Sequence, residues 1–368
     1  MHFSETTIDL GQIFNKDIQT IQLTRWREND HLACVLSSGQ LVICDLNGNV
    51  RFEANLDRFF DVDSDVAVHR YGTFLAIVNP FGLRGVVVDL NDGDWRMPLC
   101  REDYYCEHCE WPIGFYSHDC DTMLIHSTQW NRLDITNLAT GQLLTKREVC
   151  YGDSENPSKN YLDYFHSMLH MSPNERSFVI NGWHWGPFDQ LFAWETDRFL
   201  VQYENSGQPL GKLPVNGYNW NRPCCFYDDA TIAWGYNALE AYDKTDSDTE
   251  KPTDSQTELI FQNIHSAEIT RRIPFEHFGL TDQMEVKGRL WFDSERKWFV
   301  CSSNRRPSEE VKPKLGTTVA SEDGTLIQRW SQTAQFVSTS SETSAAVIGF
   351  LDETTAKLIT LTANEDSK

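Results

Sequence analysis

The sequence predicts an all-β protein, folded over residues 1–368 as a single β-propeller of seven four-stranded blades. Three observations support this fold class: a two-strand pattern recurs seven times, each copy is followed by one or two further short strands, and helical periodicity is nearly absent. The spacing between equivalent turns ranges from just over forty to about sixty-five residues, which fits blades of ~40 to 50 residues with loop insertions. The sequence leaves open whether there are seven blades or one fewer.

The recurring pattern consists of an apolar or alternating run, a tight turn of Asp, Asn, Gly, Ser or Glu, and a second apolar run, as expected for a β-hairpin. The seven predicted hairpins cover residues 21–37, 66–79, 112–127, 167–182, 224–236, 289–303 and 334–350. Further strands complete the units, for instance at 41–54 and 132–147. The best helix candidate is the short stretch 194–203.

The two ends of the chain predict how the propeller closes. The seventh unit ends after residues 357–362, one strand short, whereas a strand-like segment at 6–14 precedes the first unit. We expect the N-terminal strand to complete the last blade, because this pairing removes exposed sheet edges. The polar, acidic segment 243–256 is expected to be a mobile loop, and residues 364–368 a disordered tail.

An Asp recurs near the predicted end of the third strand, at Asp45, Asp89 and Asp134, while the fourth unit has Trp194-Glu195 there. With the preceding hairpins, this pattern resembles the WD40-like β-propeller superfamily, although no blade carries the full Gly-His and Trp-Asp signature. Segments 127–147 and 166–185 are also similar to uncharacterised bacterial propeller proteins. The resemblance implies the fold across almost the whole chain and implies no particular partner.

Composition narrows the classes of partner. The formal net charge is −22, from 54 acidic and 32 basic residues, so nucleic acid and anionic membranes are not expected as partners. The charge serves solubility or attracts a basic partner, and both interpretations stay open. No signal peptide or apolar span is recognised, and the cysteines lie in apolar strands where reduced thiols pack well, which predicts a cytoplasmic protein.

Long loops and most polar-flanked tryptophans fall in the d-to-a and b-to-c connections, which lie on one rim of a propeller. This rim supplies our candidate ligand-binding residues: Trp130, Arg132, Trp183, His184, Trp185, Trp220 and Arg222. Such a cluster can stack on a sugar or a peptide, with the two arginines donating to carboxylates. In the alternative interpretation, the tryptophans fill gaps between blades and Arg132 forms a buried pair with Asp134.

Residues Cys106, His108 and Cys109, followed by His118 and Cys120, suggest a zinc ligand set. An intervening strand of ~20 Å would separate the first three from the last two, so we predict no metal site. A half-site of the first three residues, completed by another loop, stays open.

The neighbouring Cys224 and Cys225 open a strand and should point to opposite faces, which predicts structural roles. The sequence contains no GxSxG, HExxH or P-loop motif, so we predict no catalytic residue and no cofactor.

The expected function is therefore that of a non-catalytic interaction or scaffold protein that binds a protein or peptide through the long-loop rim. The alternative is a carbohydrate-active or other hydrolytic propeller enzyme whose substrate stacks on the same tryptophans. The enzyme requires a carboxylate or histidine within reach of the aromatic cluster, and the binding module does not. The sequence leaves the oligomeric state open.

Overall fold

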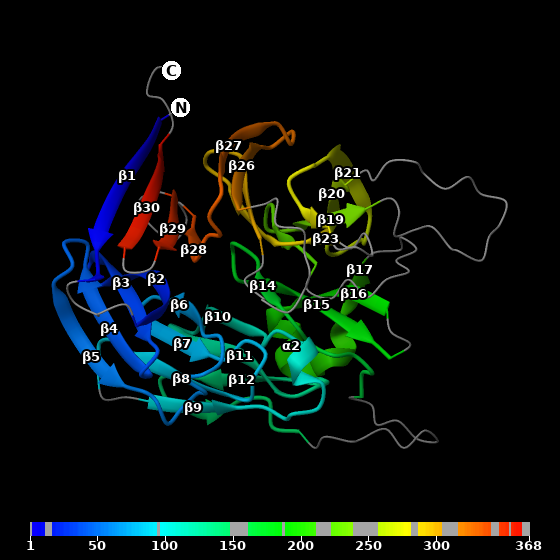
Figure 1. Cartoon of the computed structure of the whole chain (residues 1–368). Helices are drawn as coiled ribbons and strands as arrows, with labels where there is room; N and C mark the ends of the chain where they lie inside the picture. The colour runs from blue at the N-terminus through cyan, green and yellow to red at the C-terminus, as the bar shows by residue number, and fades with distance from the viewer. Residues whose placement is uncertain are drawn as a thin grey trace. The chain divides into compact units, whose positions relative to one another are not determined.

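The computed structural model describes residues 2–11, 17–93, 96–147, 161–185, 188–210, 222–237, 257–280, 286–303, 316–339, 346–352 and 355–362. Seven four-stranded antiparallel sheets form the blades of a β-propeller, which confirms the predicted fold class (Figure 1). All seven predicted hairpins are confirmed, and each forms the first two strands of its blade, with β28 (Phe336–Ser338) and β29 (Ala346–Asp352) taking this place in blade 7. The helix α2 (Thr196–Gln202) lies within the predicted stretch 194–203.

The chain divides into two compact units, the first of which comprises Met1–Glu107 and Ala334–Lys368. Blade 1 contains β2 (Ile18–Trp26), β3 (Asn29–Leu36), β4 (Gln40–Asp45) and β5 (Val50–Asn55). Blade 2 contains β6 (Ala67–Tyr71), β7 (Phe74–Val78), β8 (Arg84–Asp89) and β9 (Arg96–Cys100). Blade 7 contains β28 (Phe336–Ser338), β29 (Ala346–Asp352), β30 (Thr355–Thr362) and β1 (His2–Asp9).

The N-terminal strand completes blade 7, as predicted. Strand β1 pairs antiparallel with β30, from His2 opposite Thr362 to Asp9 opposite Thr355, and Figure 1 shows the blue strand beside the red one. The strand begins earlier than the predicted segment 6–14. Residues 4–7 are exposed, so their alternation gives no burial signal, and main-chain pairing with β30 holds this part of the strand.

The second unit comprises His108–Thr333. Blade 3 contains β10 (Ile113–His118), β11 (Asp121–Gln129), β12 (Arg132–Asn137) and β13 (Gln142–Leu143), and blade 4 contains β14 (Leu169–Met171), β15 (Ser177–His184), β16 (Phe188–Glu195) and β17 (Gln208–Leu210). Blade 5 contains β18 (Cys224–Phe226), β19 (Thr231–Asn237), β20 (Thr257–Asn263) and β21 (Ile269–Pro274), and blade 6 contains β24 (Arg289–Asp293), β25 (Trp298–Ser302), β26 (Thr317–Ser321) and β27 (Leu326–Trp330). A two-stranded hairpin, β22 (Gly279–Leu280) with β23 (Val286–Lys287), lies between them in sequence. The 3₁₀ turns are η1 (Cys106–His108), at the boundary of the two units, and η2 (Tyr203–Ser206).

The apolar core of this unit lies between neighbouring blades. One cluster joins Ile125 and Ile135 of blade 3 to Phe178 and Trp194 of blade 4, and all four side chains are buried. Each such side chain contributes roughly 1.5–3 kcal/mol when it leaves water. The middle strands are apolar on both faces because each face packs on a neighbouring sheet, and this packing fixes where the turns at their ends lie.

The third strands end as predicted in blades 1 and 2 and differently in blade 3. Strands β4 and β8 end at Asp45 and Asp89, whereas Asp134 is the third residue of β12 and Asn137 is its last. The side chain of Asn137 accepts the Thr140 N–H at 3.0 Å, and Asp45 accepts main-chain N–H groups in the corresponding turn. The pattern therefore reflects a short Asx side chain that caps the following turn, and Asp134 does not take part in it.

Candidate functional site

Four aromatic side chains gather on one rim of the second unit, and we call them the aromatic cluster: Trp130, Phe165, Trp183 and Trp185. Phe165 stacks on Trp183 with ring centroids 3.8 Å apart and planes 1° from parallel. Trp130 lies 4.4 Å from Phe165 at a tilt of 37°. Trp185 stands perpendicular to Phe165 and Trp183, at 5.4 and 5.7 Å. The structure thus brings together the three predicted tryptophans that it describes in this region.

The cluster is assembled from three connections of the chain. Trp130 lies in the turn between β11 and β12, Trp183 and Trp185 lie at the end of β15, and Phe165 precedes β14. The main chain of Phe165 exchanges two hydrogen bonds with Trp183, at 2.8 and 3.2 Å. Gly182 permits this approach, because a Cβ at that position would meet the Phe165 carbonyl oxygen at 2.1 Å. The base of the cluster is therefore held by backbone as well as by rings.

Trp185 and Phe188 occupy opposite faces of the hairpin between β15 and β16. His184 pairs with Phe188 across this hairpin and stacks on it at 4.8 Å, whereas the Trp185 ring contacts Trp183. Trp183 and His184 are successive residues of β15, so their side chains point to opposite faces. Trp185 is 43% exposed and Phe188 is 44% exposed, whereas Trp183 is 1% exposed. Trp183 is thus buried against Phe165, while Trp185 offers an aromatic surface to solvent.

His184 lies on the same face of this hairpin as Phe188 and has partners within the protein. Its Nδ1 atom is 2.5 Å from the Asp163 carbonyl oxygen, and its Nε2 atom is 3.2 Å from the Gln190 side-chain oxygen. Both ring nitrogens are thus within hydrogen-bond distance of the protein's own oxygen atoms. This arrangement orients the ring against Phe188 and does not favour a ligand contact.

Arg222 is buried rather than presented on the rim. Its guanidinium donates to one carboxylate oxygen of Asp189 at 2.8 and 3.0 Å and to the Gly235 carbonyl at 2.8 Å, and it lies 5.3 Å from the centre of the Trp234 ring. Only 1% of the residue is exposed, and its hydrogen bonds join Asp189 of blade 4 to Gly235 of blade 5. Its predicted role as a donor to a bound carboxylate gains no support.

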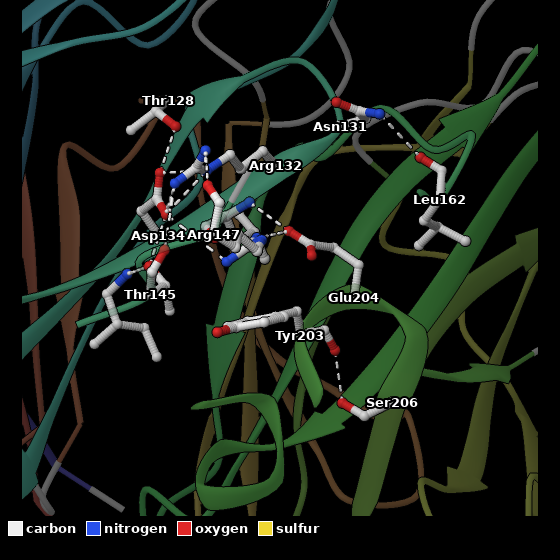
Figure 2. A network of polar contacts seen from close by, with 12 residues as sticks. Thr128, Asn131, Arg132, Asp134, Thr145, Arg147, Leu162, Tyr203, Glu204 and Ser206 are labelled. Atoms are coloured by element: carbon white, nitrogen blue, oxygen red, sulfur yellow. Dashed lines mark hydrogen bonds and ion pairs between the residues drawn. The ribbon is translucent and has the colours of Figure 1, made fainter. Parts of the chain in front are cut away.

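Arg132 belongs to a buried polar network (Figure 2). It donates to the carboxylate of Asp134 at 2.8 Å, and that carboxylate also accepts hydroxyl hydrogen bonds of 2.6 Å from Thr128 and Thr145. Burial opposes ionisation of Asp134, but these hydrogen bonds outweigh it and lower the pKa of the carboxyl group. The pair of Arg132 with Asp134 that the sequence left as an alternative is present.

Two residues that sequence reasoning missed complete this network. Arg147 forms an ion pair with Glu204 and lies over the Tyr203 ring at 4.2 Å. Figure 2 shows the two charged groups facing each other between blade 3 and the η2 turn. Burial raises the pKa of Glu204, although the charge of Arg147 acts in the opposite direction.

The ion pair of Arg147 with Glu204 takes the place of main-chain pairing on one edge of β12. Strand β13 pairs with only Thr136 and Asn137 of β12. The Leu133 N–H donates to Glu204 Oε1 at 2.9 Å, and the Leu133 carbonyl accepts from Arg147 at 2.9 Å. A side-chain ion pair thus satisfies the peptide groups that the fourth strand leaves unpaired, and it ties blade 3 to blade 4.

The sequence signals for these missed residues were weak. Phe165 lies in a stretch that the sequence assigned to a loop, and nothing in its spacing marks it as the centre of a cluster. Asp189 and Glu204 are single acidic residues in a chain with 54 of them. Only their burial, at 6% and 2% exposed, distinguishes them from the solvated ones.

Several predictions concern residues outside the described ranges. Trp220, the acidic segment 243–256 and the tail 364–368 lie outside those ranges.

In the part of the chain that the structure describes, no group of three or more His, Cys, Asp or Glu side chains is placed to hold a metal ion. Cys109 instead accepts a hydrogen bond from the Trp183 indole, at 3.3 Å. No helix within the described ranges is long and apolar enough to cross a membrane.

The comparisons with known proteins define a class by fold. No protein-family model and no curated protein sequence matches the chain. A solved structure of hydrazine synthase from Kuenenia stuttgartiensis is similar over 96% of this chain and 98% of its own, with a TM-score of 0.57 and 13% sequence identity. As 824 solved chains resemble this one, the likeness supports the seven-bladed β-propeller architecture and carries no activity with it.

Proposed function

We propose that this propeller is a non-catalytic interaction protein that binds a protein or peptide through the aromatic cluster, with Trp185 as the main contact. The observation behind the proposal is that Trp185 is 43% exposed on a base of packed rings. A tryptophan held in this way offers a large contact area and loses little conformational freedom on binding. Such residues dominate the affinity of many protein interfaces.

Three carboxylates of blades 3 and 4 pair with the protein's own arginines. Asp134, Asp189 and Glu204 are buried, and each forms an ion pair with an arginine. A glycosidase of the usual kind needs two carboxyl groups that face a common substrate. These three carboxylates are engaged by arginines inside the protein, so they do not support the alternative of a hydrolytic enzyme.

Affinity purification from a lysate with the wild-type chain, Trp185→Ala and Phe188→Ala tests the proposal. Phe188 is the matched control, because it has nearly the same exposed fraction on the opposite face of the same hairpin. We expect Trp185→Ala to lose a partner that Phe188→Ala retains. Titration with the purified partner should then show at least a tenfold weaker affinity for Trp185→Ala, in line with a loss of about 1.4 kcal/mol or more at a central interface residue.

Identical partner lists from all three proteins would contradict the proposal. Near-ultraviolet circular dichroism of each variant establishes that the cluster beneath position 185 remains packed.

A further inference from the structure

We infer that the group bound on Trp185 is a cation, the side chain of an arginine or lysine in a basic segment of the partner. The inference deepens the proposed function and rests on it. It commits to a basic peptide and not to a carboxylate-bearing or carbohydrate ligand. Three features of the chain lead to this choice.

The first feature is charge. The chain carries a formal net charge of −22, and such a field attracts basic segments and repels acidic ones. The arginines that the sequence offered for binding an anion are already used, because Arg132 pairs with Asp134 and Arg222 pairs with Asp189. Arg147 is likewise held by Glu204. An acidic ligand would therefore meet an unfavourable field and none of these three guanidinium groups.

The second feature is the setting of the Trp185 ring. It is nearly equidistant from Phe165 and Trp183, at 5.4 and 5.7 Å, and these two rings are themselves 3.8 Å apart. Equal distances of this kind place Trp185 beside the stacked pair rather than above it. The indole is thus supported from the side of the cluster and remains 43% exposed. The face of an indole carries negative electrostatic potential and is the best aromatic surface for a cation.

The third feature is that the chain repeatedly pairs its own arginines with aromatic rings. Arg147 lies 4.2 Å from the centre of Tyr203, and Arg27 lies 4.5 Å from the centre of Trp26. Arg222 lies 5.3 Å from the centre of Trp234. A basic partner would add the same kind of contact in trans, and an exposed cation–π contact strengthens binding about two- to fivefold.

A double-mutant cycle with matched peptides tests the inference on the full chain. One peptide alternates arginine with glycine over eight residues, and its control replaces every arginine by citrulline, which keeps the shape and removes the charge. Each peptide is titrated against the wild type, Trp185→Leu and Phe188→Leu by calorimetry at low and moderate salt. Peptides of alternating glutamate and glycine and an oligosaccharide of similar length serve as competing ligand classes.

We expect the ratio of the two affinities, arginine over citrulline, to fall at least twofold in Trp185→Leu and to stay at the wild-type value in Phe188→Leu. Trp185→Phe, which keeps a weaker aromatic face, should give an intermediate ratio. A ratio unchanged in Trp185→Leu means that arginine is attracted only by net charge, and this result would overturn the inference. Preferential binding of the acidic peptide or the oligosaccharide at Trp185 would overturn it as well.

The outcomes also separate this inference from the proposed function. If Trp185→Ala loses a partner but the arginine-to-citrulline affinity ratio does not change, the proposed interaction surface is supported and the inference that it binds a cation is contradicted. If the partner lists do not depend on Trp185, the proposed function itself is contradicted.

Discussion

At the scale of single residues, burial decides the state of several groups that the sequence presents as ordinary polar residues. His166 and His126 lie in the interior of the second unit, at 2% and 7% exposed. Burial lowers the pKa of His166 to about 3, assisted by the nearby charge of Arg147, and lowers the pKa of His126 to about 4. Both imidazoles are therefore neutral in the folded protein at every physiological pH.

The stability of the fold should consequently fall in mild acid. An unfolded histidine titrates near 6.5, so between about pH 6.5 and pH 3 to 4 the unfolded chain binds protons that the folded chain does not. Each of these histidines then lowers the free energy of unfolding at pH 5 by about 2 kcal/mol relative to pH 8.

We predict that His166→Phe loses less stability between pH 8 and pH 5 than the wild type, by about 2 kcal/mol. Urea unfolding at both pH values measures this difference. His265→Gln is the control, because the His265 side chain is 51% exposed. Equal pH dependence in the wild type and in His166→Phe would show that His166 is not held neutral by burial.

At the scale of elements, blade 3 shows how a side-chain pair substitutes for a strand. The short β13 leaves Leu133 of β12 without a main-chain partner on that side of the strand, and Glu204 and Arg147 supply the acceptor and the donor there. Glu204 comes from η2, between the third and fourth strands of blade 4. The insertion of α2 and η2 thus has a structural purpose that its sequence alone does not reveal.

We predict that Glu204→Ala lowers the free energy of unfolding by about 3 kcal/mol, because the buried Arg147 charge then has the Asp134 carboxylate at 3.8 Å in place of its closer partner and the Leu133 N–H loses its acceptor. Hydrogen exchange of the Leu133 amide should accelerate markedly in this variant. Asp197→Ala is the control, because it lies in the neighbouring α2 and its carboxylate is 86% exposed. It should change the free energy of unfolding by no more than about 0.5 kcal/mol and leave the exchange rate of the Leu133 amide as in the wild type. If the Glu204→Ala protein is as stable as the Asp197→Ala protein, the ion pair does not replace strand pairing on this edge of β12.

At the scale of the whole chain, the seven sheets form the architecture that the repeat predicted. Completion of blade 7 requires the two ends of the chain to pair, and eight residues of β1 lie opposite eight residues of β30. Without β1, the main-chain groups of β30 would form an open sheet edge. The N-terminal strand therefore supplies the main-chain groups that cover this edge, and its Ile8 side chain is buried in the apolar core of the unit.

We predict that deletion of residues 2–9 destabilises blade 7 and makes the protein prone to aggregate through β30. Size-exclusion chromatography and thermal unfolding measure the two effects, and a synthetic peptide with the sequence of residues 1–11 should partly restore the melting temperature. A deletion of residues 364–368, at the other terminus, serves as the control. A monomeric protein of unchanged stability after loss of residues 2–9 would argue against closure by β1.

Much of the fold was predictable because its signals are local. Alternating runs and tight turns identify each hairpin, and the connectivity of a propeller then assigns Trp130 and Trp185 to one rim. The site was predictable only in part. The sequence grouped the tryptophans correctly, but it could not place Phe165 between them or show that Arg222 is buried, because both depend on packing between blades.

The sequence by itself determined the strand order and the net charge of −22, since these follow from short-range pattern and composition, and it predicted closure by the N-terminal strand because the seventh unit ends one strand short. Tertiary structure alone decided which polar residues remain accessible. Arg147 and Glu204 are 57 residues apart and Arg222 and Asp189 are 33 apart, yet each pair is buried in contact. Desolvation couples such distant residues, and it leaves Trp185 rather than an arginine as the exposed feature of the cluster.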